Sequence, residues 1–204
     1  MDGIPWRKSA LVALVALVAC SAFASAGAEE AGQAQEAAKV QPARWAGKGR
    51  IEYVLVHKLH RVVGATEEPE VALVIDESGL KVMARAKVAS FKSGNGNRDA
   101  HALEAIDAAN HPLVVVKGVA PGFKPPATPG VVKVPLKAQV ELKGVTVPRD
   151  IEVTLDYRSP DRAEATFSFP ESLEAHQVER PSLMMIKVED ALEIRGKLAL
   201  EREP

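Results

Sequence analysis

The stretch that decides the fold is residues 88–104, which read VASFKSGNGNRDAHALE. It ends an alternation of apolar and polar residues, breaks at a run of Ser, Gly and Asn, and restarts with Arg98 and Asp99 at the head of a helical pattern. Asp99 is a suitable N-cap, and Pro112 disfavours helical geometry in the residue before it, so a short helix is predicted near residues 99–109. Arg98 and Asp99 are predicted to form a buried or half-buried pair that fixes this structural corner.

On both sides of this corner the sequence alternates with a period of two. Residues 81–88 are the clearest case, because Val82, Ala84, Ala86 and Val88 share one face and charged residues share the other. Further strands are predicted over residues 51–58, 71–75, 113–117, 131–142, 150–157, 164–169, 182–189 and 191–200. One-sided strands of this kind belong to antiparallel sheets with one solvated face. About eight such strands with one short helix predict an all-β barrel, with room for packed side chains or one ligand.

The bulk composition sets limits on the function. The chain has 204 residues, of which 47% are hydrophobic, so one domain with a real core is expected. Lys and Arg (26) nearly balance Asp and Glu (27), and aromatic residues make up only 4%. Neither the basic stripe nor the stacking aromatics of a nucleic-acid-binding protein are present, so no nucleic-acid partner is predicted.

Residues 1–26 are predicted to be a secretory signal peptide. They combine a basic start, an uncharged apolar run over 10–19 that is too short to span a membrane, and small residues at the end. The protein is therefore expected to be exported to the periplasm or envelope. Cys20 ends the apolar run as in a bacterial lipoprotein, so two routes stay open. Either cleavage before Cys20 gives a lipidated, membrane-anchored lipoprotein, or plain cleavage after Ala26 or Ala28 discards Cys20.

The segment after the signal is predicted to be a flexible linker over residues 27–47. It lacks large apolar residues until Val40 and Trp45, which is typical of a solvated tether. The folded domain is then expected over residues 48–204. It contains no cysteine, so neither a disulfide nor thiol chemistry is expected there.

The residues that could carry chemistry favour neither a metal site nor catalysis. His57 and His60 have the spacing of a helical metal pair, but on a strand residues three apart point to opposite faces. A hydrolase could use Asp99 and His101, yet the nucleophile elbow of serine hydrolases is missing. The protein is therefore predicted to be no enzyme, with no metal and no catalytic residue.

Two polar residues of the first strand leave alternatives open. His57 ends an apolar inward face, where it would either meet the polar end of a ligand or bond to backbone in the core. Tyr53 presents the same choice, because its large apolar ring carries a hydroxyl that needs a partner.

Several motifs together carry a family resemblance. They are His57 at the end of a strand, residues 90–101 (SFKSGNGNRDAH), the His111-Pro112 pair, and residues 142–148 (LKGVTVP). From about residue 51 to residue 200, the chain resembles the YceI-like family of periplasmic polyisoprenoid-binding proteins. The resemblance implies an eight-stranded, lipocalin-like antiparallel barrel with a helix near its mouth. It also implies an elongated apolar cavity for a long isoprenoid chain, such as a quinone or polyprenyl tail, and no catalytic residue.

The leading hypothesis is an exported carrier or sequestering protein that holds a long apolar, isoprenoid or quinone-type lipid and needs no cofactor. The predicted lining shares one parity, strand after strand: Tyr53, Leu55, His57, Leu73, Val82, Ala84, Ala86, Val88, Val114, Val116, Val140 and Leu142. The alternative is a ligand-free structural or interaction module of the envelope, with a filled barrel. An acidic segment over 64–70 and the small Ala84 and Ala86 depart from the family pattern, so the lipid is not specified.

Overall fold

The computed structural model describes residues 42–57, 60–180, 182–183 and 186–204. The predicted signal peptide with Cys20, and the predicted linker up to residue 41, lie outside the described residues. The long strands of the described part are β1 (Ala43–His57), β2 (His60–Thr66), β3 (Glu70–Asp76), β4 (Gly79–Lys87), β5 (Leu113–Pro121), β6 (Gly130–Leu142), β7 (Val145–Ser159), β8 (Arg162–Ser172) and β11 (Ala191–Arg202).

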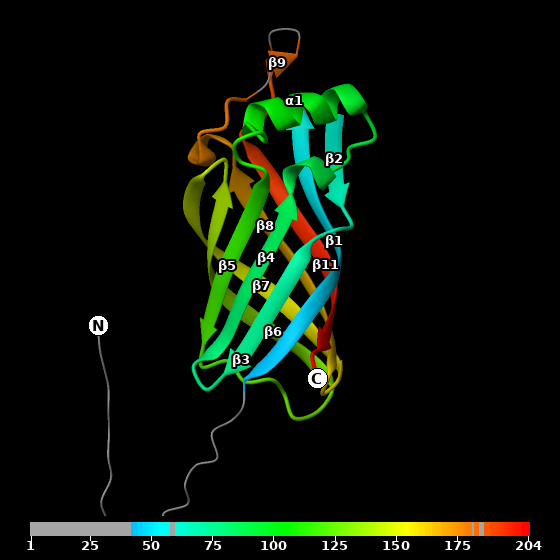
Figure 1. Cartoon of the computed structure of the whole chain (residues 1–204), viewed down its shortest axis with the longest axis vertical. Coiled ribbons are helices and arrows are strands. Elements are labelled where there is room, and N and C mark those ends of the chain that lie inside the picture. The colour runs from blue at the N-terminus through cyan, green and yellow to red at the C-terminus, as the bar shows by residue number, and fades with distance from the viewer. Residues whose placement is uncertain (1–41, 58–59, 181, 184–185) are drawn as a thin grey trace, which may run out of the picture. The chain divides into compact units, whose positions relative to one another are not determined.

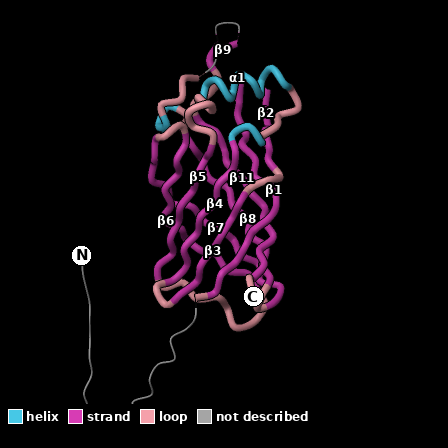
Figure 2. The backbone as a smooth tube through the Cα atoms, in the orientation of Figure 1, coloured by secondary structure: helices cyan, strands magenta, loops and turns pink. Residues whose placement is uncertain are grey.

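These strands form a closed antiparallel barrel. Their order is β11-β8-β7-β6-β5-β4-β3-β1-β2, and β11 pairs in addition with β1 (Figure 1). The second pairing closes eight strands into a ring and leaves β2 outside it. The predicted all-β barrel with one short α-helix is therefore confirmed. Helical segments gather toward one end of the barrel, here called the helical end (Figure 2).

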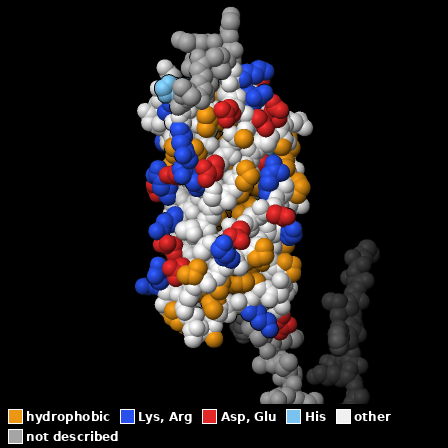
Figure 3. All heavy atoms as spheres, turned by 180° about the vertical axis from the view of Figure 1, so that it is seen from behind, with side chains coloured by type: hydrophobic (Ala, Val, Ile, Leu, Met, Phe, Trp, Pro, Cys, Tyr) orange, Lys and Arg blue, Asp and Glu red, His pale blue; other side chains and the backbone are white. Residues whose placement is uncertain are grey.

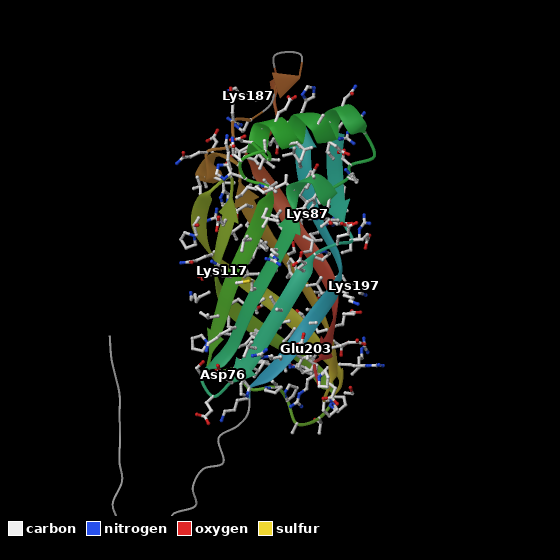
Figure 4. The ribbon with its side chains drawn as sticks, in the orientation of Figure 1. Asp76, Lys87, Lys117, Lys187, Lys197 and Glu203 are labelled. Atoms are coloured by element: carbon white, nitrogen blue, oxygen red, sulfur yellow. The ribbon has the colours of Figure 1, made fainter. Side chains whose placement is uncertain are left out.

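The alternation of the sequence produces the two faces of the wall. In β6, Val134, Leu136, Ala138 and Val140 are all buried, and the residues between them are exposed. The outer surface carries interspersed charges of both signs with small apolar patches between them (Figure 3). Lys87, Lys117 and Lys197, labelled in Figure 4, all lie on this outer surface. The apolar faces point inward because a closed wall removes them from water.

β1 is longer than predicted and changes partner along its length. Residues 43–47 pair with β3, residues 51–57 pair with β2, and the opposite edge pairs with β11. Gly49 lies between the two halves, where a Cβ would come within 2.3 Å of the Lys197 carbonyl oxygen. The backbone approach of β11 therefore requires glycine at the point where β1 changes partner.

The predicted linker boundary at residue 47 is wrong for its last residues. β1 begins at Ala43, and Trp45 is 4% exposed inside the barrel. Its ring contacts Tyr157 edge to face, with centroids 6.1 Å apart and an interplanar angle of 88°. This aromatic pair packs in the core near the end of the barrel where β1 begins, and burial raises the pKa of Tyr157 to about 12. A tryptophan amid small residues gave no periodic signal, although its size favours burial.

Two further strand predictions need correction. β2 lies between the predicted strands over residues 51–58 and 71–75, where no strand was predicted. The predicted strand over residues 182–189 is wrong as a barrel strand. It contains instead β9 (Ser182–Leu183) and β10 (Ile186–Lys187), which pair only with each other in the described part. In the sequence Pro181 stands directly before this segment, and a proline has no N–H to donate to a strand ladder.

The strand-to-helix corner has a different capping arrangement from the predicted one. Helix α1 spans Gly96–Ile106, and its N-cap is Asn95, whose side chain accepts from the Arg98 N–H. Asp107, in a left-handed conformation, caps the other end before Pro112 is reached. The predicted helix is thus confirmed in kind, with bounds shifted three residues toward the N-terminus.

Arg98 and Asp99 do fix the corner, although not by pairing with each other. Both converge on Ser93. The Arg98 side chain donates to Ser93 Oγ (2.8 Å) and Ser93 O (2.7 Å), and the Asp99 carboxylate accepts from the Ser93 hydroxyl and from its N–H (3.0 Å). Arg98 is exposed and Asp99 half-buried, and each bonds to Ser93 instead of to the other, so the predicted buried or half-buried pair is wrong. The serine hydroxyl is the shared anchor.

Candidate binding cavity

The inward faces of the barrel surround an apolar cavity of about 150 Å³. All eight strands of the ring contribute to its wall, together with Phe91 after β4. The lining residues are Ile51, Val71, Leu73, Leu80, Val82, Ala84, Arg85, Ala86, Phe91, Val114, Val116, Leu136, Val140, Leu142, Ile151, Val153, Leu155, Ala165, Phe167, Phe169, Glu171, Leu192, Ile194, Leu198 and Leu200. The lining positions extend from Leu80 to Ala86 along β4 and from Leu192 to Leu200 along β11, so the cavity follows the barrel axis along these strands.

The structure brings most of the predicted lining residues together around this cavity. Those that border it are Leu73, Val82, Ala84, Ala86, Val114, Val116, Val140 and Leu142. Tyr53, Leu55 and Val88 are not part of its wall. The side chain of His57 lies outside the described part, so both alternatives for that residue stay predictions. The eight that border the cavity all lie on β3, β4, β5 and β6, whereas the predicted lining names no residue of β7, β8 or β11.

Tyr53 instead packs beside the cavity. Its ring lies over Gly64 of β2, where a Cβ would come within 2.3 Å of the ring carbons. It also contacts Phe91, with centroids 5.9 Å apart and an interplanar angle of 40°. Burial raises the pKa of Tyr53, with a further rise from nearby Asp99. Tyr53 therefore supports Phe91, which does border the cavity.

The segment around η1 (Val88–Ser90) seals the wall beside β2. β2 is the last strand in the sheet order, so its outer edge needs another partner. Ala65 exchanges two backbone hydrogen bonds with Lys92, at 2.9 and 2.8 Å. Thr66 Oγ1 lies 2.7 Å from Ser90 Oγ, and Thr66 is 1% exposed. Val88 is buried here as part of this seal rather than of the cavity wall.

The aromatic part of the cavity wall, on β8, is absent from the predicted lining. Phe167 and Phe169 of β8 pack against each other, with centroids 6.2 Å apart. Phe167 also lies over Gly196 of β11, where a Cβ would come within 2.2 Å of the ring. Both phenylalanines share one parity in the predicted strand over 164–169, and this alternation was the signal that could have identified them.

Two charged side chains also belong to the cavity wall, and no sequence motif indicated them. Arg85 borders the cavity, but its guanidinium points outward to Glu70 (2.6 Å). Glu171, near the end of β8, lies on the inward face and is only 5% exposed. Its Oε1 accepts from the Arg149 guanidinium and from the Ser172 N–H (2.9 Å). Its Oε2 is buried without a hydrogen-bond partner among the described residues.

His176 completes this cluster from the short helix η2 (Glu174–His176). It is fully buried, with Nδ1 3.0 Å from the Val145 carbonyl oxygen and Nε2 3.3 Å from Glu171 Oε1. Nε2 is buried and has no hydrogen bond of good geometry among the described residues, so its approach to Glu171 is a close contact only. Burial acts to raise the pKa of Glu171, but contacts with His176, the Ser172 N–H and Arg149 outweigh it and lower that pKa. Glu171 is therefore a carboxylate at neutral pH.

The remaining motif residues meet at the same end of the barrel. Gly144, in the turn between β6 and β7, has a φ of +73°, and a Cβ there would come within 2.8 Å of the His111 ring. His101 Nδ1 lies 3.4 Å from Glu104 Oε2, while Asp99 is held by Ser93. Asp99 and His101 thus have separate partners, which removes the basis of the hydrolase hypothesis.

Comparison with known proteins agrees with this architecture. The model of the YceI-like domain matches residues 46–200. The chain belongs to the YceI-like family. A comparison with curated protein sequences gives no match. The match covers the ring of strands from β1 to β11, so the family assignment applies to the barrel and its cavity.

Solved structures share the YceI-like fold at low sequence identity. A polyisoprenoid binding domain from Saccharophagus degradans, implicated in plant cell wall breakdown, is 13% identical, with a TM-score of 0.66 over 78% of this chain and 98% of that one. Burkholderia cenocepacia BcnA is 16% identical, with a TM-score of 0.61 over 74% and 94%. The Campylobacter jejuni YCEI protein is 11% identical, with a TM-score of 0.56 over 73% and 89%. At these identities the likeness establishes the fold.

Two other kinds of feature are absent from the described residues. No group of three or more His, Cys, Asp or Glu side chains in this part of the chain is placed to hold a metal ion. No described helix is both long and apolar enough to cross a membrane.

Proposed function

We propose that this YceI-like protein is an exported, non-enzymatic lipid-binding protein that carries or sequesters a long apolar chain of isoprenoid or quinone type. One observation supports this proposal above the others: an apolar cavity follows the barrel axis and is lined from every strand of the ring. The family assignment and the polyisoprenoid-binding name of one structural relative agree with it. Export is proposed from the signal pattern of residues 1–26. Anchoring to the membrane would follow only if cleavage before Cys20 leaves that cysteine lipidated.

The energetics of binding favour a long chain over a small ligand. Burial of each methylene contributes about 0.8 kcal/mol, so a fifteen-carbon chain gains roughly 12 kcal/mol. Association costs about 4–15 kcal/mol in lost freedom, which a short apolar ligand would not offset. A chain that fills the length of the barrel therefore binds through its tail, and the wall selects for shape and apolarity.

The cavity is small for a long-chain ligand. At about 150 Å³ it is smaller than ordinary ligand pockets, which measure about 300–1,000 Å³. A long chain therefore enters only if side chains such as Phe91 and Phe167 change rotamer. This same observation favours the second candidate function, a filled barrel that serves as a structural or interaction module of the envelope.

Native mass spectrometry of the gently purified protein separates the two functions. A carrier is expected to retain a co-purifying lipid or to take up an added prenyl lipid with 1:1 stoichiometry. Ala84 borders the cavity from β4, so Ala84→Leu should lower uptake at least tenfold by filling the space. Ala72→Leu, on the exposed face of neighbouring β3, is the matched control. Absence of lipid in both experiments would refute the carrier and favour the filled barrel.

A further inference from the structure

The cavity ends before the barrel does. Toward the end of the barrel where β1 begins, its last lining positions include Leu73 on β3, Leu136 on β6, Leu155 on β7 and Ala165 on β8. The next inward residues in that direction pack in one apolar core, and none of them borders the cavity. This layer, here called the floor, consists of the buried residues Trp45, Ile75, Ala120, Val134, Tyr157 and Ala163.

The contact between Trp45 and Tyr157 closes the floor across the barrel. Their strands, β1 and β7, are not neighbours in the ring, because β11 and β8 lie between them on one side and β3, β4, β5 and β6 on the other. The rings of Trp45 and Tyr157 nevertheless meet edge to face, with centroids 6.1 Å apart. Each of the two residues is only 4% exposed. This contact therefore blocks the interior of the barrel at that layer.

The helical end of the cavity is packed less tightly than the floor. Val114, Leu142 and Leu192 border the cavity near this end, and all three are half-buried. Helix α1 lies at the same end, yet it contains no buried residue and none of its residues borders the cavity. A chain therefore meets less packed side-chain volume at the helical end than at the floor.

We propose that the Trp45–Tyr157 pair sets the longest chain that the barrel accepts, because it stops a tail that enters from the helical end. This inference rests on the proposed function and specifies the length of the ligand. The lining on β11 runs from Leu192 to Leu200, about 26 Å along the strand. Strands of such barrels tilt by about 35–45°, so the cavity measures roughly 20 Å along the axis. Isoprene units beyond this length stay outside the barrel, in water.

The floor limits affinity because an added isoprene unit contributes only where it is buried. Burial of its five carbons removes apolar surface from water, so affinity should rise at least tenfold with each unit until the tail reaches the floor. Further units should then give no gain. One layer of inward residues is two positions along a strand, or about 5 Å along the axis, close to the length of one isoprene unit. Removal of one floor ring should therefore lengthen the longest accepted chain by about one unit.

Native mass spectrometry of the full chain, freed of co-purified lipid by organic extraction, measures this limit. The probe is an equimolar mixture of all-trans prenyl alcohols, namely geraniol, farnesol, geranylgeraniol and longer homologues, in excess over the protein. In wild type the bound fraction should rise with chain length and stop rising at one member of the series. Trp45→Leu should move that member one unit longer. Ala165→Leu, which fills the layer directly above the floor, should move it one unit shorter.

Two exposed positions supply the controls. Val131→Ala removes apolar volume from the outer face near the same end, and Ala72→Leu adds it on the outer face of β3. Both should keep the wild-type limit. Should Trp45→Leu fail to fold, the shift in Ala165→Leu decides alone. An unchanged limit in the floor variants, or an affinity that keeps rising with length in wild type, would overturn the inference and leave the carrier function standing. Binding of no prenyl alcohol by wild type would overturn both.

Discussion

Replacement of Glu171 by Gln tests whether the buried cluster stabilises the barrel through its charge. Removal of one partner from a buried ion pair costs about 3–5 kcal/mol. The Arg149 side chain is 24% exposed, so water recovers part of its solvation, and we expect a loss of about 2 kcal/mol at pH 7. For a domain of this size, that loss lowers the melting temperature by about 4–8 °C.

The pH dependence of this loss has a definite sign. The pKa of Glu171 is lowered in the folded protein, so its contribution is fully present above the unfolded pKa of about 4.3. The contribution disappears as the pH falls through the lower, folded pKa. The difference in stability between wild type and Glu171→Gln should therefore be greatest near neutral pH and shrink steadily below about pH 4.

Urea unfolding followed by the fluorescence of buried Trp45 measures this difference between pH 3 and pH 7. Glu164→Gln is the control, because Glu164 pairs with Lys197 (3.1 Å) on the outer face, where an ion pair contributes only about 0–1 kcal/mol. Equal stability of wild type and Glu171→Gln at pH 7 would refute the reasoning. So would a difference that persists unchanged to pH 3.

Three further substitutions test the architecture. Gly49→Ala should lower the unfolding free energy by at least about 2 kcal/mol, because its Cβ would meet the Lys197 carbonyl oxygen at 2.3 Å. Thermal unfolding measures this loss. Gly130→Ala is the control, because a Cβ at Gly130 would have no atom within 4 Å. Trp45→Ala should lower the unfolding free energy, measured in urea, by about 3–5 kcal/mol. Unchanged stability would contradict the core position of Trp45 and support the linker prediction for this residue. Ser93→Ala should cost about 1–2 kcal/mol and speed amide exchange in α1 relative to the sheet; uniform exchange would contradict the role of this hydroxyl as anchor.

The barrel interior could be predicted from sequence because its signal is local. An inward position on a strand is fixed by its parity, and β4, β5 and β6 keep one parity along their whole length. That is why Ala84, Val116 and Val140 were placed correctly around the cavity. The same rule, extended to β8, would have added Phe167 and Phe169.

The second half of β1 could not be placed in this way. Tyr53 has the same parity as Ile51, which does border the cavity. From Ile51 onward β1 pairs with β2 instead of β3, and Tyr53 lies opposite Gly64, over which its ring packs beside the cavity. The change depends on how closely β11 approaches Gly49, a contact between residues far apart in sequence. The parity of a residue shows on which face of the strand it lies. The neighbouring strand determines which residues that face contacts.

The buried polar cluster could not be predicted from the sequence either, because its contacts join residues of different elements. Arg149, Glu171 and His176 come from β7, β8 and η2, and no spacing among them marks a motif. In the sequence, neither His176 nor Glu171 belongs to a recognisable motif. Their contacts exist because the ends of two neighbouring strands meet a short helix there. A buried charge of this kind becomes visible only when the packing that neutralises it is known.

The stretch over residues 88–104 connects these observations. Its sequence predicted a corner, and the structure shows what the corner does. β1 changes partner at Gly49, which leaves the free edge of β2 beside the wall. The backbone of Lys92 pairs with this edge, and Phe91 borders the cavity with Tyr53 behind it. Ser93 then ties α1 to the same point. One short segment therefore closes the barrel beside β2 and supplies an aromatic side chain to the cavity.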